Sequence, residues 1–180
     1  MIKLIFHKIL GWKIKGFTKL PNKCVLIAAP HTHWQDFFLG LAIRSSINQN
    51  IKFIGKKELF FYPLNILMNF LGGIPVNRNS NTNTVDQIST IFNDRNEFKL
   101  AISPEGTRRK VKRWKTGFYY IAQKAQVPIL LFKIDYRLKE IGVFNILKTV
   151  QDYDNDMYFI QEQYKSVTGR YPKLYNSYII

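Results

Sequence analysis

Residues 24–36, CVLIAAPHTHWQD, place a histidine and an aspartate directly after an apolar run. The apolar run at 24–29 predicts a buried strand, because a short continuous apolar segment is typical of a strand covered on both faces. His31 and Asp36 are five positions apart, so on one continuous helix their side chains would point about 140° away from each other. The two side chains can therefore meet only if the helix begins between them.

Thr32 and Gln35 provide such a helix start. They fit a capping box, with Thr32 as the N-cap and Gln35 as the third residue of a helix over 33–46. His31 and Asp36 then occupy the two positions whose side chains touch in a hydrophobic staple. An aspartate that holds one imidazole nitrogen leaves the other free to take a proton from a substrate hydroxyl. A helix start with a purely structural, buried polar pair fits the same pattern, and this motif alone does not separate the two interpretations.

The rest of the chain alternates predicted strands with predicted helices. The sequence predicts strands at 24–29, 51–54, 74–77, 98–102 and 127–134, and helices at 33–46, 58–70, 84–94 and 116–125. One or two further strands are expected in 135–150, followed by a last helix with apolar residues at helical spacing: Met157, Ile160, Tyr164 and Val167. This alternation predicts an α/β fold with a mostly parallel sheet flanked by helices. We expect a single domain over 1–180, with a core at 24–134 and C-terminal strands and a helix at 135–180.

The chain is strongly basic, with 27 Lys and Arg against 12 Asp and Glu and a formal net charge of +15. Such an excess favours an anionic partner: nucleic acid, an anionic membrane surface or an acidic carrier protein. We find no base-stacking or helix-turn-helix signature, so no nucleic-acid partner is expected. Residues 108–115 carry six of the positive charges in eight positions. This run predicts contact with an anionic leaflet, where Trp114 would suit the interface, or with an acidic carrier; a solvated loop is the alternative.

The N-terminal residues suggest a membrane-interface helix. Neither a transmembrane helix nor a cleaved signal peptide is expected, because no run of about 20 apolar residues occurs and no small-residue cleavage site follows the N-terminus. Residues 1–20 instead predict an amphipathic helix with lysines toward the lipid head groups and Trp12 among the buried residues. A helix docked on the core is the alternative. We expect a peripheral protein at the cytoplasmic face of the cell membrane.

Polar residues follow three of the predicted strands. His31 and Asp36 follow the strand at 24–29, Arg78 follows the strand at 74–77, and the segment SPEGTR at 103–108 follows the strand at 98–102. Ligands of open α/β sheets bind at the carboxyl ends of the strands. Arginine grips phosphate bidentately, so this set predicts a site for a polar, phosphate-bearing substrate.

Four motifs occur in order and at sensible separations: His31 and Asp36 as His-x4-Asp, GIPVNR at 73–78, PEGTR at 104–108 and VPI at 127–129. On these motifs the chain resembles the glycerophospholipid acyltransferase family of the 1-acylglycerol-3-phosphate (lysophosphatidic acid) acyltransferase type. The matched region runs from about residue 24 to residue 134 and covers most of the chain.

This resemblance implies transfer of a fatty acyl group from acyl-CoA or acyl carrier protein to the free hydroxyl of a lysophospholipid, first of all 1-acyl-sn-glycerol-3-phosphate, giving phosphatidic acid. It implies that His31 is the general base and that Asp36 orients it. It also implies a head-group site formed by Arg78, Glu105, Gly106, Thr107 and Arg108. No metal and no other cofactor is expected. The alternatives are the same chemistry on another lyso-lipid, such as an aminoacyl lipid, and a non-catalytic basic membrane-binding protein.

Overall fold

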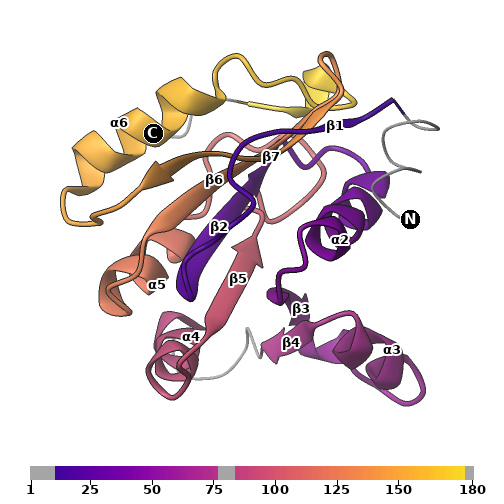
Figure 1. The fold of residues 1–180 in the computed structure, drawn as a ribbon, viewed down its shortest axis with the longest axis vertical. Helices are drawn as coiled ribbons and strands as arrows, with labels where there is room; N and C mark the ends of the chain where they lie inside the picture. Colours follow the sequence, from indigo (N-terminus) through magenta and orange to yellow (C-terminus); the bar gives the residue numbers. More distant parts are fainter. Residues whose placement is uncertain (1–10, 77–83, 177–180) are drawn as a thin grey trace.

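Seven strands form one sheet in the computed structural model, which describes residues 11–76 and 84–176 (Figure 1). The strand order is β1-β7-β6-β2-β5-β3-β4, and only β6 and β7 pair in antiparallel fashion. The strands are β1 (Lys13–Ile14), β2 (Lys23–Ala29), β3 (Ile51–Lys56), β4 (Gly73–Val76), β5 (Phe98–Ile102), β6 (Ile129–Asp135) and β7 (Glu140–Leu147). The expected α/β fold with a mostly parallel sheet is confirmed.

Helices cover both faces of this sheet, as the apolar central strands require. The helices are α2 (Gln35–Ser46), α3 (Leu64–Phe70), α4 (Thr84–Asn93), α5 (Gly117–Lys124) and α6 (Tyr153–Tyr164), with 3-10 turns η1 (Lys57–Leu59) and η2 (Pro172–Leu174). Val25 and Ile27 belong to a core with residues of α4, α5 and α6, whereas Cys24 and Leu26 belong to a second core with residues of α2. Figure 1 shows α2 on one side of the sheet and α4, α5 and α6 on the other.

The helix predicted over 58–70 is interrupted. Residues 57–59 form η1, and α3 begins only at Leu64, directly after Pro63. Proline has no N–H to donate and restricts the residue before it, so a continuous helix cannot pass through this position. The segment therefore turns back sharply, and α3 leads into β4, an edge strand in which Pro75 is exposed.

The helix predicted for residues 1–20 is wrong for the part that the structure describes. Residues 1–10 lie outside the described residues, and from residue 11 onward the chain is extended. Lys13 pairs with Glu140 as β1 adds a parallel strand to the edge of β7. Gly11 and Gly16 have φ of 66° and 86°, a left-handed conformation that interrupts a helix. Trp12 is buried as predicted, but against the sheet, where its ring lies edge-on to Tyr136.

The C-terminal part follows the prediction closely. One strand, β7, occupies the segment expected to hold one or two, and Met157, Ile160 and Tyr164 on α6 are buried. α6 ends at Tyr164, before Val167, which still packs into the same core. Within residues 11–76 and 84–176, no helix combines the length and apolar character needed to cross a bilayer.

Candidate active site

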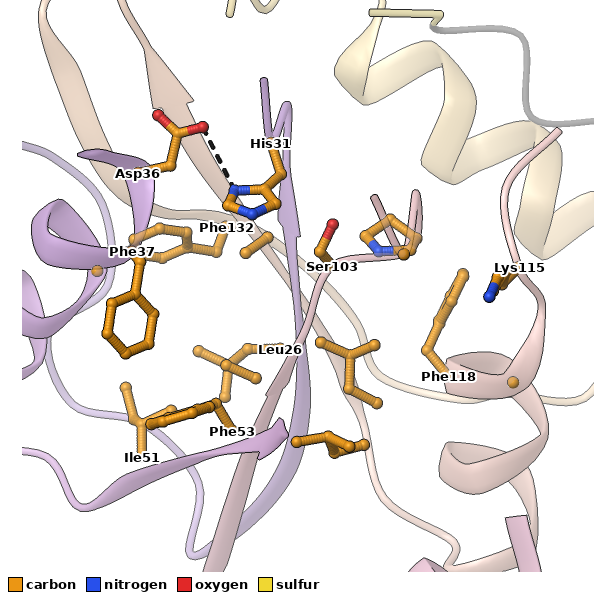
Figure 2. Close-up of a pocket in the computed structure, with 18 of the residues that line it drawn as sticks. Leu26, His31, Asp36, Phe37, Ile51, Phe53, Ser103, Lys115, Phe118 and Phe132 are labelled. Atoms are coloured by element: carbon orange, nitrogen blue, oxygen red, sulfur yellow. Dashed lines mark ion pairs between the residues drawn. The ribbon is translucent and has the colours of Figure 1, made fainter. Parts of the chain in front are cut away.

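His31, in the loop after β2, meets Asp36, in the first turn of α2, at the carboxyl end of a central strand (Figure 2). The imidazole Nδ1 lies 3.3 Å from Asp36 Oδ2. The contact predicted from the sequence is therefore present. Asp36 is buried, whereas His31 keeps part of its surface open toward a pocket.

The capping box predicted for Thr32 does not form. α2 begins at Gln35, and its N-cap, Trp34, makes no side-chain capping bond. Asp36 Oδ2 instead accepts the N–H of Thr32 at 2.9 Å and the N–H of His33 at 2.8 Å. A charged carboxylate is a stronger acceptor than a hydroxyl, so Asp36 takes these free donors before the helix. The Thr32 hydroxyl oxygen accepts the N–H of Tyr171 at 3.2 Å.

Tyr136 is a third member of this group, and sequence reasoning missed it. Its hydroxyl donates to Asp36 Oδ1 at 2.6 Å. Tyr136 follows directly after β6, which lies beside β2 in the sheet, so both strands deliver polar residues to the same edge. That position at the carboxyl end of a predicted strand was the signal available in the sequence.

Asp36 is held as a carboxylate. Burial opposes the charged form, but hydrogen bonds from His31, Tyr136 and the His33 N–H outweigh burial and lower the pKa of Asp36 below its usual value. An ionised Asp36 favours the imidazole tautomer that carries its proton on Nδ1 and leaves Nε2 as an acceptor. In Figure 2 the ring nitrogen that is not paired with Asp36 faces the pocket.

Glu105 contacts the site through the main chain of His31. Its Oε2 accepts the N–H of His31 at 2.7 Å, and the Ser103 hydroxyl lies 3.4 Å from the same oxygen. Glu105 is buried, and burial raises its pKa to about 7. Glu105 is not among the residues that line the pocket, and its contact in the structure is with the main chain of His31, so its head-group role stays a prediction.

A pocket of about 950 Å³ opens beside His31. Three of the expected head-group residues, Gly106, Thr107 and Arg108, line it together with Lys115. Gly106 has φ of 66°, and a Cβ there would lie 3.0 Å from the Lys115 side chain, so glycine suits both the turn and the close approach. Arg78, the remaining predicted phosphate ligand, lies outside the described residues.

The rest of the pocket wall is mostly apolar and draws on both cores. Figure 2 shows Leu26, Phe37 and Phe53 on the α2 side of the pocket and Phe118 on the α5 side. The pocket can reach both sides because β3 pairs with β5 only as far as Phe53 and Ala101, and beyond that point β3 pairs with β4 alone. A pocket of this shape and lining suits an apolar chain with a polar end near His31.

The basic run at 108–115 is only partly what the sequence suggested. Arg108, Arg109 and Lys112 are exposed. Trp114, expected at a lipid interface, is 4% exposed and packs edge-on against Tyr164 in the core. Its neighbour Lys115 faces the pocket, so the run supplies positive charge to the site and its rim without an apolar anchor of its own.

No group of three or more His, Cys, Asp or Glu side chains suited to a metal ion occurs in the described part of the chain.

Comparison with known proteins gives a family and a fold. The sequence model of the Acyltransferase family matches residues 12–133. A solved structure of the 1-acyl-sn-glycerophosphate (LPA) acyltransferase PlsC from Thermotoga maritima has a similar fold, with a TM-score of 0.61 and 19% identity, covering 94% of this chain and 78% of that one. No curated protein matches the sequence. The family match spans more than half of the chain, and the protein belongs to the Acyltransferase family and is an acyltransferase.

Proposed function

We propose that this enzyme transfers a fatty acyl group from acyl-CoA or acyl carrier protein to the free hydroxyl of 1-acyl-sn-glycerol-3-phosphate, giving phosphatidic acid. The observation that carries the proposal is the His31–Asp36 pair at the edge of an apolar pocket whose wall also holds Arg108 and Lys115. The similar fold of PlsC, which is named as an acyltransferase of this acceptor, supports the choice of substrate.

In the proposed reaction, His31 Nε2 takes the proton of the acceptor hydroxyl as its oxygen attacks the thioester carbonyl. The tetrahedral intermediate then expels the thiolate, which takes the proton back from the imidazolium, so the products are an ester and a free thiol. Asp36 stays ionised throughout and stabilises the imidazolium. A positioned base of this kind contributes on the order of 10²–10⁴-fold to the rate. The thioester is already an activated acyl group, so the proposed chemistry needs no cofactor.

The two ends of the substrate would lie in different parts of the pocket. We assign the phosphate to Arg108, with Lys115, Gly106 and Thr107 near it, because guanidinium and ammonium groups bind phosphate. The resemblance adds Arg78 to this phosphate site. The apolar part of the wall would hold an acyl chain. Because both candidate donors are cytoplasmic molecules and the acceptor is a lipid, we place the enzyme at the cytoplasmic face of the membrane as a peripheral protein.

The test is acyl transfer in mixed micelles with lysophosphatidic acid, a panel of other lyso-lipids, and both CoA and acyl-carrier-protein thioesters. His31→Ala should lose about 10²–10⁴-fold in kcat while keeping its circular dichroism spectrum. His33→Ala is the matched control, because His33 lies two positions away and its Nδ1 accepts a main-chain N–H from Gln35. Transfer only to another lyso-lipid would replace the acceptor, and equal activity of wild type and His31→Ala would refute the mechanism.

A further inference from the structure

The segment from residue 60 to residue 76 stands out in this highly charged chain. Its 17 residues, FFYPLNILMNFLGGIPV, include no Asp, Glu, Lys, Arg or His, although 22% of the chain is Asp, Glu, Lys or Arg. Lys56 and Lys57 come shortly before the segment, and Arg78 comes shortly after it. An uncharged aromatic segment between cationic flanks has the composition of an element that meets an anionic lipid surface.

This segment exposes its large apolar side chains to solvent. The exposed fractions are 59% for Phe61, 80% for Tyr62, 62% for Ile66, 51% for Leu67 and 81% for Phe70. We call these five side chains the α3 surface. All residues of α3 are described, and none of them is buried. Several large exposed apolar side chains on one short segment indicate an interaction site on a folded protein.

The inward side of the segment is already packed. Phe60 and Met68 lie over two glycines of the neighbouring strands, Gly55 in β3 and Gly73 in β4, so close that a Cβ on Gly55 would lie 2.8 Å from the Phe60 ring. α3 is thus mounted on β3 and β4 with its α3 surface facing away from them. The exposed side chains need a partner outside the described fold.

The residues that follow α3 contact side chains of the pocket wall. Phe53, which lines the pocket, also packs within 3.2 Å of the Cβ position of Gly73. Arg44 of α2 donates to the carbonyl of Leu71, just after α3, and Figure 1 shows α2 and α3 on the same side of the molecule. Trp34, directly before α2, and Phe38 within it add two exposed aromatic side chains, whose ring centroids lie 5.6 Å apart. Exposed apolar side chains therefore occur on two elements that contact residues of the pocket wall, although these exposed side chains do not line the pocket themselves.

We propose that the α3 surface inserts into the head-group region of an anionic bilayer and brings the pocket to the lipid. The net charge of +15 favours an anionic leaflet and opposes self-association, because two copies of this chain repel each other. Tyrosine and phenylalanine are also side chains that suit the membrane interface. The inference rests on the proposed function in one respect: a lipid acceptor is the reason that the enzyme needs to bind a bilayer.

Site-directed labelling tests the insertion directly. Cys24 is completely buried, and burial raises its thiol pKa to about 12, so it should not react with a thiol-directed fluorophore. Phe70→Cys therefore gives one labelled position on the α3 surface, and Tyr158→Cys gives a matched control on α6, where Tyr158 is 60% exposed. With vesicles of phosphatidylcholine and phosphatidylglycerol, the label at 70 should shift to the blue and be quenched by brominated lipid. The label at 158 should show neither change.

Vesicle sedimentation tests the contribution of the side chains. The double variant Tyr62→Ser/Phe70→Ser should lower the partition coefficient for these vesicles by at least about tenfold, and Tyr158→Ser should leave it unchanged. Unchanged binding by the double variant would overturn the proposal. A concentration-dependent blue shift at position 70 without vesicles, with sedimentation as a dimer, would also overturn it and make a second copy the partner.

Activity on a short-chain lyso-acceptor that is monomeric in water separates this inference from the proposed function. The double variant should keep wild-type activity on that acceptor and lose activity on vesicle-bound acceptor. An active wild-type enzyme that ignores vesicles would refute membrane insertion alone. A wild type that binds vesicles through the α3 surface but acylates no acceptor would refute the proposed function alone.

Discussion

The turn at residues 30–36 lines the pocket, whereas no residue of the α3 segment does, and the two regions differ in what they expose to solvent. In the turn, the carboxylate of Asp36 is buried and has four hydrogen-bonding partners: the N–H groups of Thr32 and His33, the Tyr136 hydroxyl and the imidazole of His31. In α3, large apolar side chains stand in water. In the first region the protein itself supplies the hydrogen-bonding partners of Asp36, and these bonds position His31. The second is incomplete without a partner, so its substitution should affect association and leave the fold intact.

Asp36→Ala should produce the largest effect, because it removes the shared acceptor of the turn. Each donor left without a partner costs about 1–3 kcal/mol, so we expect the free energy of unfolding to fall by at least about 3 kcal/mol. We expect kcat to fall on the order of 10³-fold, since the base loses its orientation. Urea denaturation and steady-state kinetics measure the two effects. A loss of activity with unchanged stability would show that the hydrogen bonds to Asp36 contribute little to the fold.

Glu105→Gln should change how stability depends on pH. Burial raises the pKa of Glu105 from 4.5 to about 7, so the folded protein holds this proton more tightly than the unfolded chain does. The resulting stabilisation is full below about pH 4.5 and is lost as the pH rises to about 7, a change of roughly 3 kcal/mol. Urea midpoints at about pH 4 and about pH 8 should therefore differ more for wild type than for the variant. Parallel pH curves for the two proteins would exclude Glu105 as the titrating group.

Tyr136→Phe should have a smaller effect confined to the turn. The variant loses the 2.6 Å hydrogen bond to Asp36, so the pKa of Asp36 should rise toward its usual value and stability should fall by about 1–2 kcal/mol. We expect kcat to fall severalfold with KM unchanged, because Tyr136 positions Asp36 without contacting substrate. Tyr119→Phe is the matched control, since Tyr119 donates a similar bond of 2.9 Å to Asp156. Equal kcat values for the two variants would show that Tyr136 does not position Asp36 for catalysis.

Phe70→Ser should have the smallest effect on stability. Its side chain is 81% exposed, so we expect the free energy of unfolding to change by no more than about 0.5 kcal/mol. Thermal denaturation of the variant beside Asp36→Ala measures the contrast between the two regions. A large loss of stability in Phe70→Ser would show that α3 stabilises the fold, as the turn at residues 30–36 does.

The sequence was informative where local pattern decides the structure. The strand at 98–102 was predicted with the bounds that are observed, because an apolar run between turns determines it. The contact between His31 and Asp36 was predicted correctly, but the Thr32 capping box expected beside it does not form, since spacing alone does not say which acceptor captures a free N–H. Glu105 and Tyr136 reach the turn over 74 and 100 positions of chain, and only the strand order brings them there. The position of each residue after a predicted strand indicates this edge of the sheet, but it does not identify the atoms that they contact.

β1 and the α3 surface were missed for a related reason. Lys13 and Ile14 form a strand because β7 offers an open edge, which residues 1–20 do not reveal on their own. The residues of 58–70 are apolar enough for a core helix, and apolar character alone cannot distinguish a side chain that faces the core from one that faces outward. Burial in the folded structure makes that distinction.

The proline at the edge of the sheet has a consequence for the membrane association that we propose. β4 is a four-residue outer strand, and Pro75 within it has no N–H to offer to an approaching chain. Crowding on a bilayer raises the local concentration of protein, which promotes edge-to-edge strand pairing and aggregation. A short outer strand interrupted by proline is a poor template for that process, so many copies could share one leaflet without joining their sheets at this edge.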